Sequence, residues 1–69
     1  MKNKLDLHGV KHIDVDVIVE DFILLNKPPF SIVTGNSTTM QNKTLNLLKR
    51  HNFKWMILSH NLGEIIVTG

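Results

Sequence analysis

An aspartate and a histidine near the amino terminus, Asp6 and His8, stand two positions apart in a segment where they alternate with Leu5 and Leu7. Alternate residues of an extended chain point to the same face, so we expect Asp6 and His8 to lie side by side, away from the leucines. The imidazole could act as a general base or acid on a ribose hydroxyl or an attacking water, with the carboxylate orienting it. A strand-end pair that only completes hydrogen bonds is the simpler interpretation of these two residues alone.

A second segment that could do chemistry is the turn Thr34, Gly35, Asn36 and Ser37, which precedes a predicted helix. The first turn of a helix has backbone N–H groups without intrahelical acceptors and the positive end of the helix dipole, so it can hold a phosphate. Gly35 would let another backbone come close. Turn geometry and helix capping explain the same residues without a ligand, and the turn alone favours that explanation.

Hydrophobic patterning predicts the strands that must position these residues. Short apolar or alternating runs predict four strands, at residues 4–7, 30–33, 55–58 and 65–67. Between the last two, residues 61–63 are predicted to form a turn.

Apolar residues at helical spacing predict two helices, at residues 13–25 and from about 38 to 51. The expected buried face of the first consists of Val15, Ile18, Val19, Phe22 and Leu25. The expected buried face of the second has Leu45 and Leu48 as its clearest positions, flanked by Met40, Thr44 and Leu47. Thr38 with Gln41 three residues later forms a capping-box pattern, and Ser37 is the alternative cap.

The predicted order of elements is β-α-β-α-β-β, in a single domain that spans residues 1–69. Two right-handed helical crossovers make the first three strands parallel, and the short last connection makes the fourth antiparallel. Both helices then fall on one face of a four-stranded mixed sheet. The expected fold class is therefore α/β in the broad sense, an α+β two-layer sandwich.

In a sheet of this kind, ligands gather at the carboxyl ends of the parallel strands. Polar and glycine residues converge on that edge from all four strands: His8, Gly9, Thr34, Gly35, Asn36, Ser37, Ser59, His60, Asn61, Gly63 and Glu64. The opposite edge has no comparable set. From their positions at the strand ends, we expect His8, Gly35 and Gly63 to line one cleft.

Composition and charge argue against a structural zinc site and indicate where a phosphate could be contacted. The chain has no cysteine, and its four histidines form no i, i+4 pair on a predicted helix, so we expect no structural zinc site. The net charge of +2 is unevenly spread, with acids alone between residues 14 and 21 and bases alone between 43 and 54. Lys43 and Arg50 could therefore make secondary phosphate contacts, although a solvated surface explains them equally well.

The amino-terminal residues are charged and polar, and no apolar run is long enough to cross a bilayer. We therefore expect neither a signal peptide nor a membrane partner. The lack of cysteine suits a cytoplasmic protein.

Three segments taken together resemble the Smr (small MutS-related) domain family. Residues 5–9, LDLHG, match the box that opens this domain. Residues 33–37 stand where the family has a strand leading into a His/Thr-Gly-x-Gly motif, and residues 61–67 resemble its closing Gly-x-x-x-Val strand. The resemblance covers residues 4–68 and points to a short stand-alone variant with a Thr-Gly-Asn-Ser second motif.

The resemblance implies a fold similar to the carboxyl-terminal domain of translation initiation factor three, and activity as an endonuclease or binder of RNA or DNA. The family's catalytic role would fall on Asp6 and His8. With the basic residues above, the predicted nucleic-acid-binding set is Gly9, Thr34, Gly35, Asn36, Ser37, Lys43, Arg50 and Gly63.

The chain departs from the family pattern at three positions. Asn36 and Ser37 replace a basic residue and a second glycine, and neither can supply positive charge to a pentavalent phosphate. Glu64 stands where a small or hydroxyl residue is more usual, and its carboxylate would oppose phosphate unless a divalent ion bridged the two.

The leading hypothesis is a monomeric endonuclease, acid–base or metal-assisted, that nicks or cuts RNA or structured DNA. A nucleic-acid-binding module without catalysis and a protein-docking domain are the alternatives. The sequence does not determine a cofactor, and a divalent metal ion is the candidate.

Overall fold

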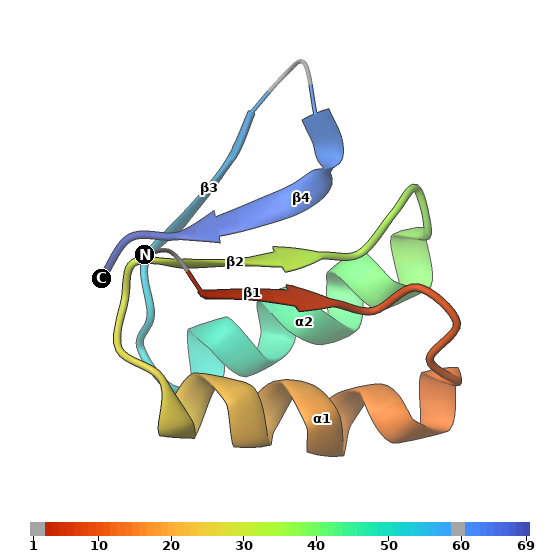
Figure 1. The fold of residues 1–69 in the computed structure, drawn as a ribbon, viewed down its shortest axis with the longest axis horizontal. Helices are drawn as coiled ribbons and strands as arrows, with labels where there is room; N and C mark the ends of the chain where they lie inside the picture. The colour runs from red at the N-terminus through yellow and green to blue at the C-terminus, as the bar shows by residue number, and fades with distance from the viewer. Residues whose placement is uncertain (1–2, 59–60) are drawn as a thin grey trace.

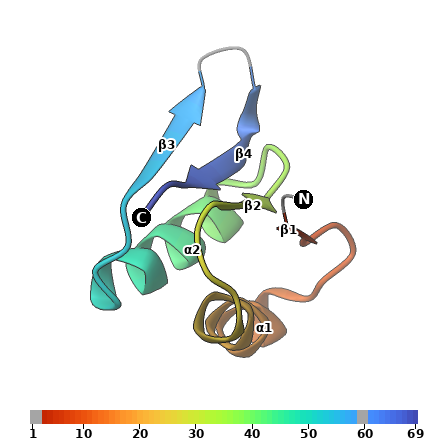
Figure 2. The same cartoon turned by 60° about the vertical axis from the view of Figure 1, so that its left-hand side comes forward.

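A four-stranded mixed sheet lies across two helices in the computed structural model, which describes residues 3–58 and 61–69 (Figures 1 and 2). In chain order the elements are β1 (Asn3–Asp6), α1 (His12–Leu25), β2 (Phe30–Val33), α2 (Thr38–Arg50), β3 (Trp55–Leu58) and β4 (Asn61–Val67). Both helices cover the same face of the sheet, and the other face has no helix on it. The predicted α+β two-layer sandwich and its β-α-β-α-β-β order are confirmed.

The strands are arranged in the order β1-β2-β4-β3. β1 pairs with β2 in parallel, while β4 runs antiparallel to both β2 and β3. The crossover through α2 therefore carries the chain from β2 past one empty place to β3, and β4 returns to fill that place. Phe30 of β2 and Trp55 of β3 are consequently both register partners of Val67.

The core lies between the sheet and the helices. Its fully or nearly fully buried apolar residues are Leu7, Val15, Val19, Ile23, Phe30, Ile32, Met40, Leu47, Leu48, Ile65 and Val67. Phe30 stands at its centre, with its ring 5.2 Å from that of Phe22 and 5.9 Å from that of Phe53, both in edge-to-face arrangements. The buried side chains thus come from α1, β2, α2, β4 and the turn after β1, while β1 and β3 add the half-buried Leu5, Trp55 and Ile57.

Two helix positions differ from the sequence-based prediction. Leu25 is 82% exposed, and Ile23 is buried in its place. At about 100° per residue, position 25 has turned about 120° away from the middle of the face formed by Val15, Val19 and Ile23. In α2, Leu45 is only half-buried, whereas Thr44 and Leu47, expected at the flank, are buried.

Several boundaries also differ, and β1, predicted at residues 4–7, spans Asn3–Asp6, so that Leu7 lies just after it. Asn61 and Gly63 were expected in a turn, but both lie in the seven-residue strand β4. The strand bends there (Figure 1), and its register with β3 shifts between Ile57 and Leu58. Ser37, rather than Thr38, caps α2, since its hydroxyl accepts a 3.3 Å hydrogen bond from the backbone N–H of Met40.

The two helices are also joined by charged side chains. Lys43 Nζ of α2 lies 3.9 Å from Asp16 Oδ2 of α1, and His51 Nε2 lies 3.1 Å from Glu20 Oε2. His51, the residue that follows α2, therefore bridges the two helices. Neither helix in the described residues is long and apolar enough to span a membrane.

Thr44 gives a test of the core packing. Its side chain is fully buried, and among the described residues its hydroxyl has no hydrogen-bond partner. Valine has the same shape without the polar group, so Thr44→Val should raise the free energy of unfolding by about 1 kcal/mol in urea titration. Thr39→Val, at an exposed position of the same helix, is the matched control and should change it by less than about 0.5 kcal/mol. A destabilised Thr44→Val variant would mean that the hydroxyl has a partner in solution.

Candidate nucleic-acid interface

Asp6 and His8 contact each other, as the alternating pattern predicts. His8 lies in the turn that follows β1, and its Nδ1 is 2.9 Å from Asp6 Oδ1. The backbone N–H of His8 donates to the same oxygen, also at 2.9 Å. Both side chains are largely exposed. The pair is therefore held by local geometry rather than by burial.

These two hydrogen bonds set the charge of Asp6. The backbone N–H of His8, and after it the His8 side chain, hold the pKa of the Asp6 carboxyl below its ordinary value. At neutral pH Asp6 is a carboxylate, which can only accept hydrogen bonds. In the neutral imidazole the proton therefore lies on Nδ1, and Nε2 is left as the basic nitrogen.

The turn after β2 is built on the carbonyl oxygen of Gly63 in β4. That oxygen accepts hydrogen bonds from the backbone N–H groups of Thr34 at 2.8 Å and Gly35 at 3.1 Å. The buried Thr34 hydroxyl lies 3.3 Å from the same oxygen and 3.1 Å from Gly35 O. Gln41 Nε2 donates to Gly35 O at 3.4 Å from the first turns of α2.

The turn leaves a limited set of backbone donors for a ligand. The amides of Thr34 and Gly35 already bond to Gly63, and that of Met40 bonds to the Ser37 cap. Within the described part of the chain, the amides of Asn36 and Ser37 donate to no protein acceptor. A phosphate at this edge would therefore meet the amides of Asn36 and Ser37 at the positive end of the α2 dipole.

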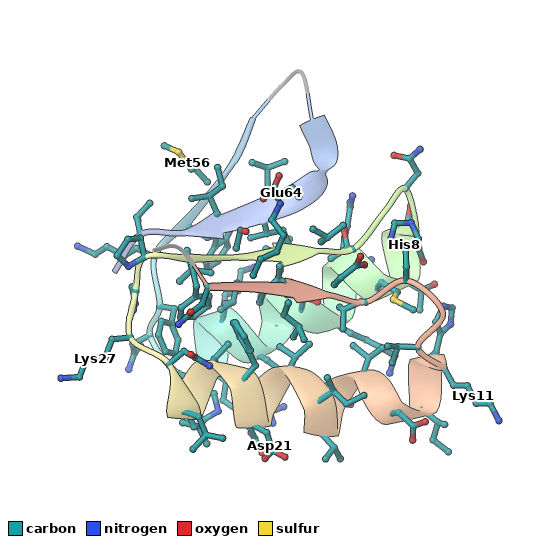
Figure 3. The ribbon with its side chains drawn as sticks, in the orientation of Figure 1. His8, Lys11, Asp21, Lys27, Met56 and Glu64 are labelled. Carbon is teal, nitrogen blue, oxygen red and sulfur yellow. The ribbon has the colours of Figure 1, made fainter. Side chains whose placement is uncertain are left out.

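His8, Gly35 and Gly63, which were predicted to line one cleft, lie close together. Gly35 has φ of +65°, and a Cβ placed on it would be 3.6 Å from His8 Nε2. A Cβ on Gly63 would be 3.2 Å from Gly35 Cα and from its carbonyl carbon. Figure 3 shows the His8 side chain rising from the turn after β1 toward the loop after β2. The basic nitrogen of His8 thus faces the glycine turn.

Other predicted residues lie elsewhere. Lys43 faces Asp16 across a cleft between the helices, and Arg50, which lines the same cleft, is the last residue of α2. Neither lies at the edge that holds His8. Gly9 lies in the exposed turn beside His8 with φ of +77°, and Asn36 is exposed at the tip of the next turn.

Glu64 does not point into this edge. Figure 3 shows it on the helix-free face of the sheet, where its Oε2 lies 3.7 Å from Lys4 Nζ. The side-chain positions of Ser59, His60 and Asn61 lie outside the described residues. Sequence patterns did not indicate Gln41 as a support for the turn, because its spacing from Ser37 and Thr38 suggested only a capping role.

Within residues 3–58 and 61–69, no three histidine, aspartate or glutamate side chains come together as a metal-binding group. Asp6 and His8 are the one acid–histidine pair at this edge of the described structure. Comparison with known proteins adds no relative: no family model, curated protein or solved structure matches the chain. The resemblance to the Smr family therefore depends on the motif residues themselves.

Gly63 gives a structural test of the site. Gly63→Ala should lower the free energy of unfolding by about 1–2 kcal/mol, because the new methyl group meets backbone atoms of Gly35 that cannot rotate away. Gly69→Ala is the control, since a Cβ there meets nothing within 4 Å and the unfolded-state entropy changes in the same way. Urea denaturation of both variants makes the comparison. Equal stabilities would show that the two backbones are not in contact.

The lowered pKa of Asp6 gives a test by titration. Carbon-detected NMR of the Asp6 carboxyl should give a pKa below that of an ordinary aspartate. In His8→Ala the pKa should rise only part of the way, because the backbone N–H of residue 8 remains. The pair should stabilise the fold above the ordinary aspartate pKa and lose that effect as the pH falls through the lowered value. A fully ordinary pKa in the unsubstituted protein would contradict the hydrogen bonds.

Proposed function

We propose that this chain is an Smr-like nucleic-acid-binding domain and an endonuclease that cuts RNA or structured DNA. The observation that supports the proposal most directly is the placement of His8. Its Nδ1 is oriented by the Asp6 carboxylate, and its Nε2 faces the glycine turn that opens α2. A general base and a candidate phosphate site lie side by side, which is the minimum that phosphodiester cleavage requires.

On RNA, His8 Nε2 would take the proton of a ribose 2′-hydroxyl. The resulting oxygen attacks the adjacent phosphorus, and the bond from phosphorus to the 5′-oxygen breaks. The 5′-oxygen takes a proton from a water molecule, the hydroxide that remains takes the proton back from His8, and the other product carries a 2′,3′-cyclic phosphate. Asp6 acts through His8: it keeps the proton on Nδ1 and stabilises the imidazolium that forms.

The turn would hold the phosphate without a cationic side chain. Asn36 is neutral, and the Ser37 hydroxyl already caps α2. The backbone amides and the helix dipole would stabilise the transition state, and they supply less positive charge than an arginine would. We therefore propose a slow nuclease, and a divalent cation from solution could supply charge on the phosphate.

We propose further that the protein acts as a monomer in the cytoplasm, with nucleic acid as its partner. Two acids of α1, Asp16 and Glu20, approach Lys43 of α2 and His51, the residue after α2. Nucleic acid is therefore proposed to meet the edge of the sheet rather than the helix pair.

The test is a cleavage assay on labelled RNA and structured DNA, with and without EDTA. His8→Ala should lower the cleavage rate at least about 100-fold, because the general base is lost. Both His8 and Asp6 lie outside the core, so the variant should keep its circular dichroism spectrum. His12→Ala, which changes an exposed histidine at the start of α1, is the matched control and should cut at the normal rate.

Binding measured by fluorescence anisotropy at several salt concentrations separates the alternatives. For about three neutralised phosphates, the slope of log K against log salt should be about −2 to −3. Salt-dependent binding without cleavage would make the domain a nucleic-acid-binding module. Cleavage that survives in His8→Ala would remove the acid–base mechanism, and absence of both binding and cleavage would favour a protein-docking domain.

A further inference from the structure

The outer face of α1 carries a stripe of aliphatic side chains that the fold does not bury. Ile13 is 83% exposed, Val17 65% and Leu24 61%. At about 100° per residue, these three residues lie within about 40° of one another around the helix and extend about 16 Å along it. The opposite face of α1 is already buried against the sheet through Val15, Val19 and Ile23. Helix α1 therefore has two apolar faces, and only one of them is buried in the core.

Carboxylates border this stripe on both sides. Asp16 and Glu20 lie on the side of α2, where they approach Lys43 and His51. At about 100° per residue, Asp14 and Asp21 lie on the other side of the stripe, and both are exposed. Figure 3 shows Asp21 directed away from the sheet, into solvent. Within the described residues neither Asp14 nor Asp21 forms an ion pair, so their charges are available to a partner.

A cleft extends the stripe toward α2. It has a volume of about 260 Å³ and is lined by Val17, Leu47 and the acids Asp16 and Glu20, with Lys43 and Arg50 on its far wall. Val17 lies both in the stripe and in the cleft. An apolar side chain inserted beside Val17 could therefore contact Leu47 at the base of the cleft while flanking cations meet the acids.

We propose that the outer face of α1 docks an amphipathic helix of a partner protein, with large aliphatic residues along one side and lysine or arginine on both flanks. A single exposed aliphatic residue is ordinary, but three in line between two acidic rows form a surface that fits such a helix. The proposal goes beyond the proposed nuclease function and does not rest on it.

The charge of the surface selects this occupant over two others. A second copy of the chain, placed with its α1 against the first, would bring the acidic rows of both copies together, and like charges at an interface weaken it. Nucleic acid is repelled by the same carboxylates. A basic helix satisfies both the apolar stripe and the acids beside it.

The experiment uses a synthetic probe: an amphipathic peptide of about 18 residues made of leucine and lysine, with leucines at helical spacing. The peptide is titrated into ¹⁵N-labelled protein and followed by amide NMR shifts. The shifts should map to α1 and the adjoining side of α2. A peptide with glutamate in place of every lysine should bind at least about tenfold more weakly, because it meets the acids with like charge.

Two pairs of variants locate the surface. Val17→Gln with Leu24→Gln should raise the Kd of the lysine peptide at least about tenfold, and Asp14→Asn with Asp21→Asn should raise it and reduce its salt dependence. Met56→Gln, which changes an exposed apolar residue on the opposite layer of the molecule, should leave the Kd unchanged. His8→Ala should also leave it unchanged, so failure here is independent of the nuclease result.

Shifts that map away from α1, equal binding of the two peptides, or no binding at all would overturn the proposal. Sedimentation velocity tests whether a second copy of the chain covers the stripe instead. A dimer that dissociates in the Val17→Gln, Leu24→Gln variant would show that a second copy, and not a basic helix, covers the stripe.

Discussion

The carbonyl oxygen of Gly63 fixes the geometry of the edge on which the proposed nuclease function depends. It accepts the amides of Thr34 and Gly35, and the two glycine backbones approach so closely that a Cβ on Gly63 would be 3.2 Å from Gly35 Cα. This contact sets where the chain turns after β2 and therefore where α2 begins. It also sets what His8 faces, because a Cβ placed on Gly35 would be 3.6 Å from the imidazole Nε2. The turns after β1 and β2 and the start of β4 are thus brought together by one acceptor atom and by the absence of side chains at Gly35 and Gly63.

Much of the fold follows from local patterns in the sequence. The spacing of Val15 and Val19 and the strands at residues 30–33 and 55–58 are short-range signals, and the structure has them where they are expected. The pairing of Asp6 with His8 is equally local, since it needs only two residues on one face of an extended segment. Strand order is different in kind. Nothing in the run at residues 61–67 indicates that it lies between β2 and β3 rather than beyond β3.

The same distinction applies to the candidate site. That His8, Gly35 and Gly63 come together was predictable, because parallel strands deliver their carboxyl ends to one edge. That Glu64 turns to Lys4 on the open face of the sheet was not, because it depends on which strand lies beside β2. Lys43 shows a similar limit: a basic run in the sequence suggests a phosphate-binding surface, but packing of the two helices places Asp16 across from it.

The position of β4 has a consequence for how the domain is made. β4 is the last strand in the chain, yet it lies between β2 and β3 and contributes Ile65 and Val67 to the core. Until it arrives, β3 has no hydrogen-bonded neighbour in the described sheet, and the edge of β2 that β4 covers is open. On the ribosome, the residues before β4 would form an incomplete sheet with exposed apolar surface. The domain should therefore acquire its structure in a single late step, after residues 61–67 have left the exit tunnel, and not progressively from its amino-terminal half.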